Sequence, residues 1–137
     1  MKSILALAIV LAVVSSHGLE TNTGKNCDTS LTAITVSSFN VTPWPPIKNK
    51  TLGMVLAGTV NQAETLATME IYVKYQGASI FHESVKESGT YAAGAPINIS
   101  FSTFLPSIAP SGSYEVDSKL TNTSGAFLNC WAVFFTL

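Results

Sequence analysis

The stretch "MEIYVKY", residues 69–75, decides how this chain folds. Its apolar residues Met69, Ile71 and Val73 alternate with Glu70, Tyr72 and Lys74, whose side chains are charged or carry a hydroxyl. Strict alternation over about four to eight residues is typical of a half-buried β-strand, which turns one face to the core and the other to solvent. The stretch therefore predicts a strand at the surface of a β-sheet.

The same period of two recurs in four other runs, at residues 52–60, 97–101, 114–120 and 131–137. In the third of these runs it places Glu115, Asp117 and Lys119 on the solvent side. Segments rich in Pro, Gly, Ser and Asn separate the runs, and no stretch keeps a helical period for more than a turn or two. We therefore predict strands at 31–39, 51–61, 68–76, 79–86, 95–102, 112–121 and 126–136. Strands at this spacing predict an all-β fold, an immunoglobulin-like β-sandwich of about seven strands.

The N-terminus has the pattern of a secretory signal peptide, which we place at residues 1–18. A lysine at position 2 precedes an apolar run at 4–14, and small residues allow cleavage after Ser16 or Gly18. The apolar run is shorter than the ~20 residues that a membrane-spanning helix needs. We therefore predict a single secreted domain over residues 19–137.

The charge of the chain argues against nucleic acid as a partner. All seven basic residues are lysines, the eight acidic residues outnumber them, and charged residues make up 11% of the chain. Nucleic-acid affinity comes mainly from clustered Lys and Arg. Without arginine the chain also lacks the side chain that binds phosphate through two parallel hydrogen bonds.

Two cysteines and four glycosylation sequons fit a secreted protein. Cys27 and Cys130 are an even pair in an oxidising compartment, so we predict a disulfide, with two buried free thiols as the alternative. The N-x-[ST] sequons are candidate glycan acceptors. They begin at Asn40, Asn49, Asn98 and Asn122.

The sequence offers little for catalysis or cofactor binding. His82 is the histidine beyond the signal peptide, and no serine stands in a G-x-S-x-G context. No cluster has metal-ligand spacing, so we predict no metal and no cofactor. A glycosidase pair such as Glu70 with Glu115 stays open, because carboxylates can meet in space. We nevertheless predict that the protein is not an enzyme.

Three segments resemble the ML (lipid-recognition) family, which includes phosphatidylglycerol/phosphatidylinositol transfer proteins and the Niemann–Pick type C sterol carrier. The segments are "VTPWPP" (41–46), "GTVNQAETLATMEIYVKYQGASIF" (58–81) and "LPSIAPSGSYEVDSKLTNTSGAFLNCWAVFF" (105–135). The resemblance implies that Cys27 bonds to Cys130 and that two parted sheets hold a lipid between them. Two further disulfides common in the family are missing here, which should loosen the loops at the mouth of the sandwich.

The inward-facing residues of the predicted strands are the candidates for lining an apolar cavity between the sheets, although any sandwich core would give the same set. They are Met54, Leu56, Met69, Ile71, Val73, Ile97, Ile99, Phe101, Tyr114, Val116, Trp131, Val133 and Phe135. The two methionines are favoured because Met adapts to varied apolar partners, and Trp131 is a candidate for the cavity floor. Apolar residues in or beside loops could form a mouth that touches membrane or could cap the core. These are Trp44, Ile47, Ile80 and Phe81.

These patterns together predict a monomeric carrier that binds and transfers a lipid or sterol without catalysis. It would contact membranes transiently and reside outside the cell or in an endolysosomal or vacuolar lumen. The alternative is a secreted β-sandwich that binds a protein or glycan and keeps a solid core. An extracellular hydrolase is the third class.

Overall fold

The computed structural model describes residues 23–137. The predicted signal peptide at 1–18, its cleavage site and the first residues of the predicted domain therefore lie outside the described part. Within residues 23–137 no helix is long and apolar enough to cross a membrane.

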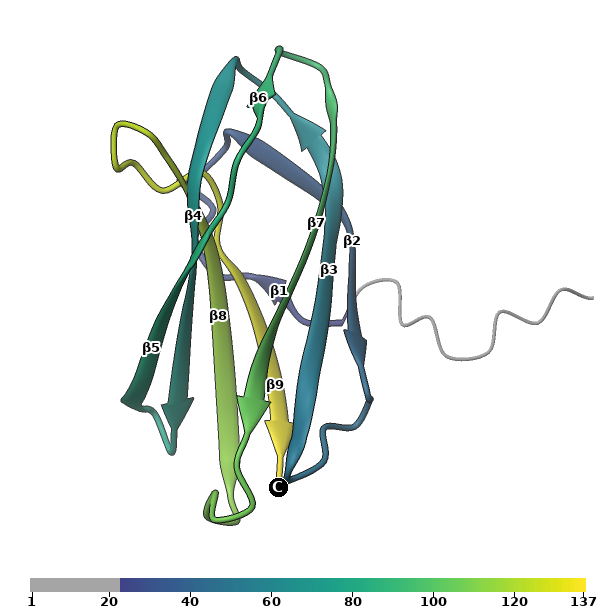
Figure 1. Ribbon diagram of the computed structural model, residues 1–137, viewed down its shortest axis with the longest axis vertical. Helices are drawn as coiled ribbons and strands as arrows, with labels where there is room; N and C mark the ends of the chain where they lie inside the picture. Colours follow the sequence, from purple (N-terminus) through teal and green to yellow (C-terminus); the bar gives the residue numbers. More distant parts are fainter. Residues whose placement is uncertain (1–22) are drawn as a thin grey trace, which may run out of the picture.

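Two antiparallel sheets form the described part of the chain (Figure 1). The larger sheet has the order β1-β9-β8-β4-β5, with β6 paired to β4, and the smaller has the order β2-β3-β7. The strands are β1 (Lys25–Asn26), β2 (Ile34–Thr42), β3 (Lys50–Val60), β4 (Glu64–Tyr75), β5 (Ala78–Lys86), β6 (Thr90–Tyr91), β7 (Pro96–Leu105), β8 (Ser113–Asn122) and β9 (Trp131–Thr136). This is an immunoglobulin-like β-sandwich, so the predicted fold class is confirmed.

The seven predicted strands correspond to the seven long strands of the structure, with differences at their ends. The last strand begins at Trp131 instead of 126, because residues 122–126 form a turn around the Asn122 side chain. The Oδ1 atom of Asn122 accepts hydrogen bonds from the backbone N–H groups of Ser124 and Ala126, at 3.1 and 2.9 Å. Strand β7 continues to Leu105, three residues beyond the end of the strand predicted at 95–102.

One side of the sandwich is closed by aromatic packing. Phe39 of β2 is fully buried between the sheets. Its ring stacks on Trp131 of the larger sheet, with centroids 5.8 Å apart, and meets the edge of Phe101 at 6.0 Å. Buried aromatic pairs of this kind add to the energy of area burial. This packing holds the two sheets together along their β2 and β9 sides.

A disulfide joins Cys27, directly after β1, to Cys130, directly before β9. The Cα atoms of the two residues are 5.1 Å apart, and the Cys27 N–H donates to the Cys130 carbonyl at 3.1 Å. The covalent loop has a sequence separation of 103. Closing so long a loop restricts the unfolded chain, which in the chain-entropy account contributes about 4–5 kcal/mol.

The prediction that Asp117 faces solvent is wrong. The residue lies on the outer face of β8, but it is only 5% exposed. Lys74 of the neighbouring strand covers it, with Nζ 3.0 Å from Asp117 Oδ2 and 3.7 Å from Glu115 Oε2. The hydrogen bond from Lys74 to Asp117 raises the lysine pKa. Strand periodicity gives the face of a residue, and a long neighbouring side chain can still bury it.

Gly58 of β3 and Gly53 of the same strand differ in how closely the backbone of β2 approaches them. A Cβ atom at Gly58 would overlap the carbonyl oxygen of Thr35, whereas at Gly53 it would lie 3.4 Å from the nearest atom, the carbonyl oxygen of Thr42. We expect Gly58→Ala to lower the free energy of unfolding by about 1–3 kcal/mol, as overpacking typically does. Gly53→Ala should change it by much less. Urea unfolding followed by tryptophan fluorescence measures both, and equal losses would contradict the contact at Gly58.

Candidate ligand-binding site

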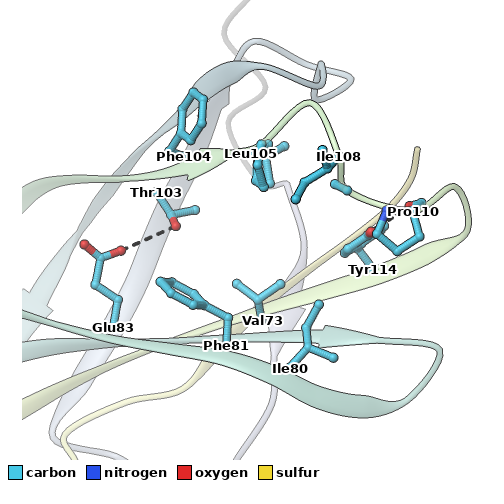
Figure 2. Close-up of a pocket in the computed structure, with 12 residues that line it drawn as sticks. Val73, Ile80, Phe81, Glu83, Thr103, Phe104, Leu105, Ile108, Pro110 and Tyr114 are labelled. Carbon is cyan, nitrogen blue, oxygen red and sulfur yellow. Dashed lines mark hydrogen bonds between the residues drawn. The ribbon is translucent and has the colours of Figure 1, made fainter.

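An apolar cavity of about 520 Å³ lies between the edge strands of the two sheets, on the side away from Phe39 (Figure 2). Strand β5 borders it from the larger sheet and the end of β7 from the smaller one, and the β7–β8 loop closes one end. The lining residues are Val73, Ile80, Phe81, Glu83, Thr103, Phe104, Leu105, Pro106, Ile108, Ala109, Pro110 and Tyr114.

Strand β5 presents two consecutive apolar residues to this cavity because of a bulge. Val73 pairs with Phe81, but the next residue, Lys74, pairs with Ser79, so Ile80 is an extra residue in the strand. Consecutive residues of a regular strand point to opposite faces. The bulge breaks that alternation and lets both Ile80 and Phe81 line the cavity.

The β7–β8 loop is held at its base and exposed at its tip. The backbone groups of Gly112 and Leu137 exchange two hydrogen bonds of 3.0 Å, and the Tyr75 hydroxyl donates to the Ser111 carbonyl at 2.9 Å. At the tip, the side chain of Ile108 is 88% exposed although it borders the cavity. Hydrogen bonds therefore hold the base of the loop, and its tip exposes the apolar side chain of Ile108 to solvent.

Polar groups lie at the two ends of the cavity (Figure 2). At one end the Tyr114 hydroxyl donates to the Pro110 carbonyl at 2.6 Å, and burial raises the pKa of this phenol. At the other end the buried hydroxyl of Thr103 donates to Glu83 Oε2 at 3.5 Å. The walls between these two ends are apolar.

Of the thirteen residues predicted to line a cavity, Val73 and Tyr114 border this one. Ten others are buried in the core between the sheets, and Trp131 is half-buried on the closed side. Those ten are Met54, Leu56, Met69, Ile71, Ile97, Ile99, Phe101, Val116, Val133 and Phe135. A sandwich that opens further would bring more of this core to a ligand, so their contact with ligand stays a prediction.

Two of the four predicted mouth residues, Ile80 and Phe81, are half-exposed and line the cavity. Trp44 and Ile47 are also exposed, but they belong to the β2–β3 connection and are not part of the lining. This connection and the β7–β8 loop lie at the same end of the molecule, near the C-terminus (Figure 1).

Sequence reasoning missed most of the lining. The segment 105–113 is one of the Pro-, Gly- and Ser-rich segments that separate the predicted strands, and it supplies Leu105, Ile108 and neighbouring residues to the cavity. Glu83 also lines the cavity, and the sequence analysis did not single it out. Its position was predictable, because Phe81 and Val85 lie two residues before and after it and therefore on the same face of the strand.

His82 lies on the outer face of the larger sheet, in a cluster of hydrogen-bonded side chains. Glu70 Oε2 lies 2.9 Å from His82 Nε2, and Ser84 donates to the other oxygen at 3.0 Å. Burial pushes the pKa of Glu70 upward, but the hydrogen bonds from these partners and Thr68 outweigh it and lower the pKa. Because Ser84 donates to Glu70 and not to His82, the group does not have the order of a nucleophile and its base.

The register places Glu70 and Glu115, the open glycosidase pair, at separate positions along the sheet. Glu115 stands opposite Lys74, four residues along β4 from Glu70, so their backbone positions are about 13 Å apart at ~3.3 Å per residue. Glu115 contacts Lys74, whereas Glu70 contacts His82 and Ser84. Among residues 23–137 no three His, Cys, Asp or Glu side chains are grouped to hold a metal ion.

The sequons differ in accessibility. Asn49 and Asn98 are exposed, in the β2–β3 connection and on β7. Asn40 is half-buried, and its Oδ1 atom is enclosed. The Nδ2 atom of Asn122 donates to Glu64 Oε2 at 3.0 Å.

Known proteins are similar to this chain in sequence or in fold. A Dictyostelium discoideum protein, described as a candidate phosphatidylglycerol/phosphatidylinositol transfer protein, is 25% identical over 136 residues, which cover 95% of each chain. The crystal structure of a Niemann-Pick type C2 protein from the Japanese carpenter ant matches with a TM-score of 0.67 at 10% identity, over 82% of this chain and 97% of that one. Chicken MD-1, crystallised in complex with lipid IVa, matches with a TM-score of 0.56 at 17% identity, over 82% and 85% of the two chains. The family model described as ML domain matches residues 21–137. The chain therefore belongs to the ML family.

Proposed function

We propose that this protein binds a lipid or sterol in the cavity between β5 and β7 and transfers it between membranes without catalysis. The apolar cavity of about 520 Å³ carries this proposal. Its volume lies in the range of small-molecule sites, about 300–1,000 Å³. An apolar ligand gains about 25 cal/mol for each Å² of surface that it removes from water. The lipid IVa bound to chicken MD-1 and the description of the Dictyostelium relative support the same class of ligand.

Several features support a secreted or endolysosomal protein that meets membranes. The disulfide between Cys27 and Cys130 fits an oxidising compartment, as does the signal peptide predicted from the sequence. Four apolar side chains at the cavity, at least half exposed, form what we call the apolar rim: Ile80, Phe81, Phe104 and Ile108. A contiguous exposed apolar patch marks an interaction surface, and here it surrounds the opening that a ligand must pass. We propose that the rim touches the bilayer while the ligand enters or leaves.

Filling the cavity should block uptake. Ala109 is a half-buried lining residue, so we expect Ala109→Trp to place an indole in the space that a ligand needs and to lower bound lipid at least about tenfold. Native mass spectrometry of the secreted protein, with solvent extraction and lipid analysis, measures the loss.

The matched control is Ala93→Trp, which adds the same side chain at an exposed position in the β6–β7 loop. It should leave the bound lipid unchanged, and the unfolding midpoints of both variants show whether the fold is intact. The proposal fails if the wild-type protein releases no lipid on extraction and also takes up no sterol or phospholipid from liposomes. That result would favour a β-sandwich that binds a protein or glycan.

If the apolar rim contacts the membrane, a substitution in the rim should change the rate of lipid transfer more than the affinity for lipid. Ile108→Ser removes the most exposed rim side chain, so we expect slower transfer of a fluorescent lipid between vesicles, by about three- to tenfold, with nearly unchanged equilibrium binding. Phe127→Ser is the control, because Phe127 is also exposed but lies outside the cavity lining. Equal transfer rates for wild type and Ile108→Ser would contradict membrane contact through the rim.

Glycan attachment should follow the accessibility of the sequons. We propose that Asn49 and Asn98 carry glycan and that Asn122 does not, because its Nδ2 atom is hydrogen-bonded to the buried Glu64 carboxylate. In protein secreted from eukaryotic cells, Asn49→Gln and Asn98→Gln should each remove one glycan mass, and Asn122→Gln none. Peptide mapping after enzymatic deglycosylation checks this, and full occupancy at Asn122 would overturn the assignment.

A further inference from the structure

The cavity contains an acid on a face where strands normally place apolar residues. Glu83 pairs with the fully buried Ile71 of β4, and a directly opposed residue shares its partner's face of the sheet. Its neighbours at a period of two, Phe81 and Val85, have the same orientation. Among the twelve lining residues in the described part of the chain, Glu83 supplies the one carboxylate, and none is a lysine or arginine.

The carboxylate of Glu83 has hydrogen-bond acceptor positions that the described residues do not fill. The hydrogen bond that it receives from Thr103 is 3.5 Å long, against about 2.7–2.8 Å for a typical O–H···O bond. An ionised carboxylate offers about four acceptor positions, and within residues 23–137 Thr103 is the partner that the structure shows for Glu83. Glu83 is half-buried, and a ligand that supplies a hydrogen-bond donor can use these unfilled acceptor positions.

The position of this carboxylate fits the polar end of an elongated ligand. Figure 2 shows Glu83 reaching from β5 toward Thr103 on β7 at one end of the cavity, with Tyr114 and Pro110 at the other. The Tyr114 hydroxyl is already committed to the Pro110 carbonyl. Of the two ends, within the described residues, the Glu83 end therefore offers a carboxylate with unfilled acceptor positions beside apolar walls.

We propose that Glu83 selects ligands by their polar group: it accepts a hydrogen bond from a hydroxyl or ammonium head and rejects a carboxylate head. This inference rests on the proposed lipid-binding function and adds the chemical class of the ligand. A donor head gains a charge-assisted hydrogen bond. An anionic head would lie beside a like charge, with no lysine or arginine among the lining residues of the described part to offset it.

The test compares three probes with the same alkyl chain: tetradecanol, tetradecylamine and tetradecanoic acid. Binding to the full secreted protein is measured at neutral pH by titration calorimetry or by native mass spectrometry in competition. We expect the alcohol and the amine to bind the wild type at least about tenfold more tightly than the acid. Glu83→Gln keeps the size of the side chain and removes its charge, so it should weaken amine binding and strengthen acid binding, each by about tenfold.

The control is Glu115→Gln, which removes the same charge from the outer face of the larger sheet and should leave the ranking unchanged. Glu83→Ala serves as a second variant, with the same expected loss of discrimination, and unfolding midpoints verify that each protein is folded. If the wild type binds all three probes equally, or if both Glu83 variants keep its ranking, the role of Glu83 is overturned while lipid binding stands. If the wild type binds none of the probes and releases no lipid on extraction, both proposals fall.

Discussion

The packing of Phe39, on the smaller sheet, against Trp131, on the larger one, is the contact on which the rest of the structure depends. It joins the two sheets along one side, where the Cys27–Cys130 disulfide also ties β1 to the start of β9. On the opposite side of the sandwich, the apolar cavity lies between the edge strands β5 and β7.

The chemistry of the cavity follows from its place between two edge strands. A central strand has hydrogen-bonded neighbours on both sides, whereas β5 and β7 each have one. Their free edges leave room for a ligand, and the β7–β8 loop, held by Gly112 and Tyr75, closes the end. The same arrangement places exposed apolar side chains beside the opening. The cavity and the apolar rim are thus features of one edge of the fold.

The sequence was enough to predict the fold, because a period of two in runs such as 69–75 is a local property. It also predicted which residues face inward, including Val73 and Tyr114. It could not show which inward residues border empty space, since that depends on how far the sheets separate. Asp117 illustrates the same limit, because Lys74, which buries it, comes from a neighbouring strand. Ile108 was missed because its loop looks like an ordinary turn until β7 and β8 are placed beside β5.

The bulge at Ile80 has a further consequence, for the solubility of the protein. An exposed edge strand with apolar side chains can pair with the same strand of another molecule and start aggregation. A bulge bends and twists the strand, so that its free backbone groups no longer form a flat, regular edge. The irregularity that turns Ile80 and Phe81 toward the cavity therefore also makes β5 a poor template for intermolecular pairing. The edge that borders the cavity can in this way stay exposed while offering a neighbouring molecule a less regular strand to pair with.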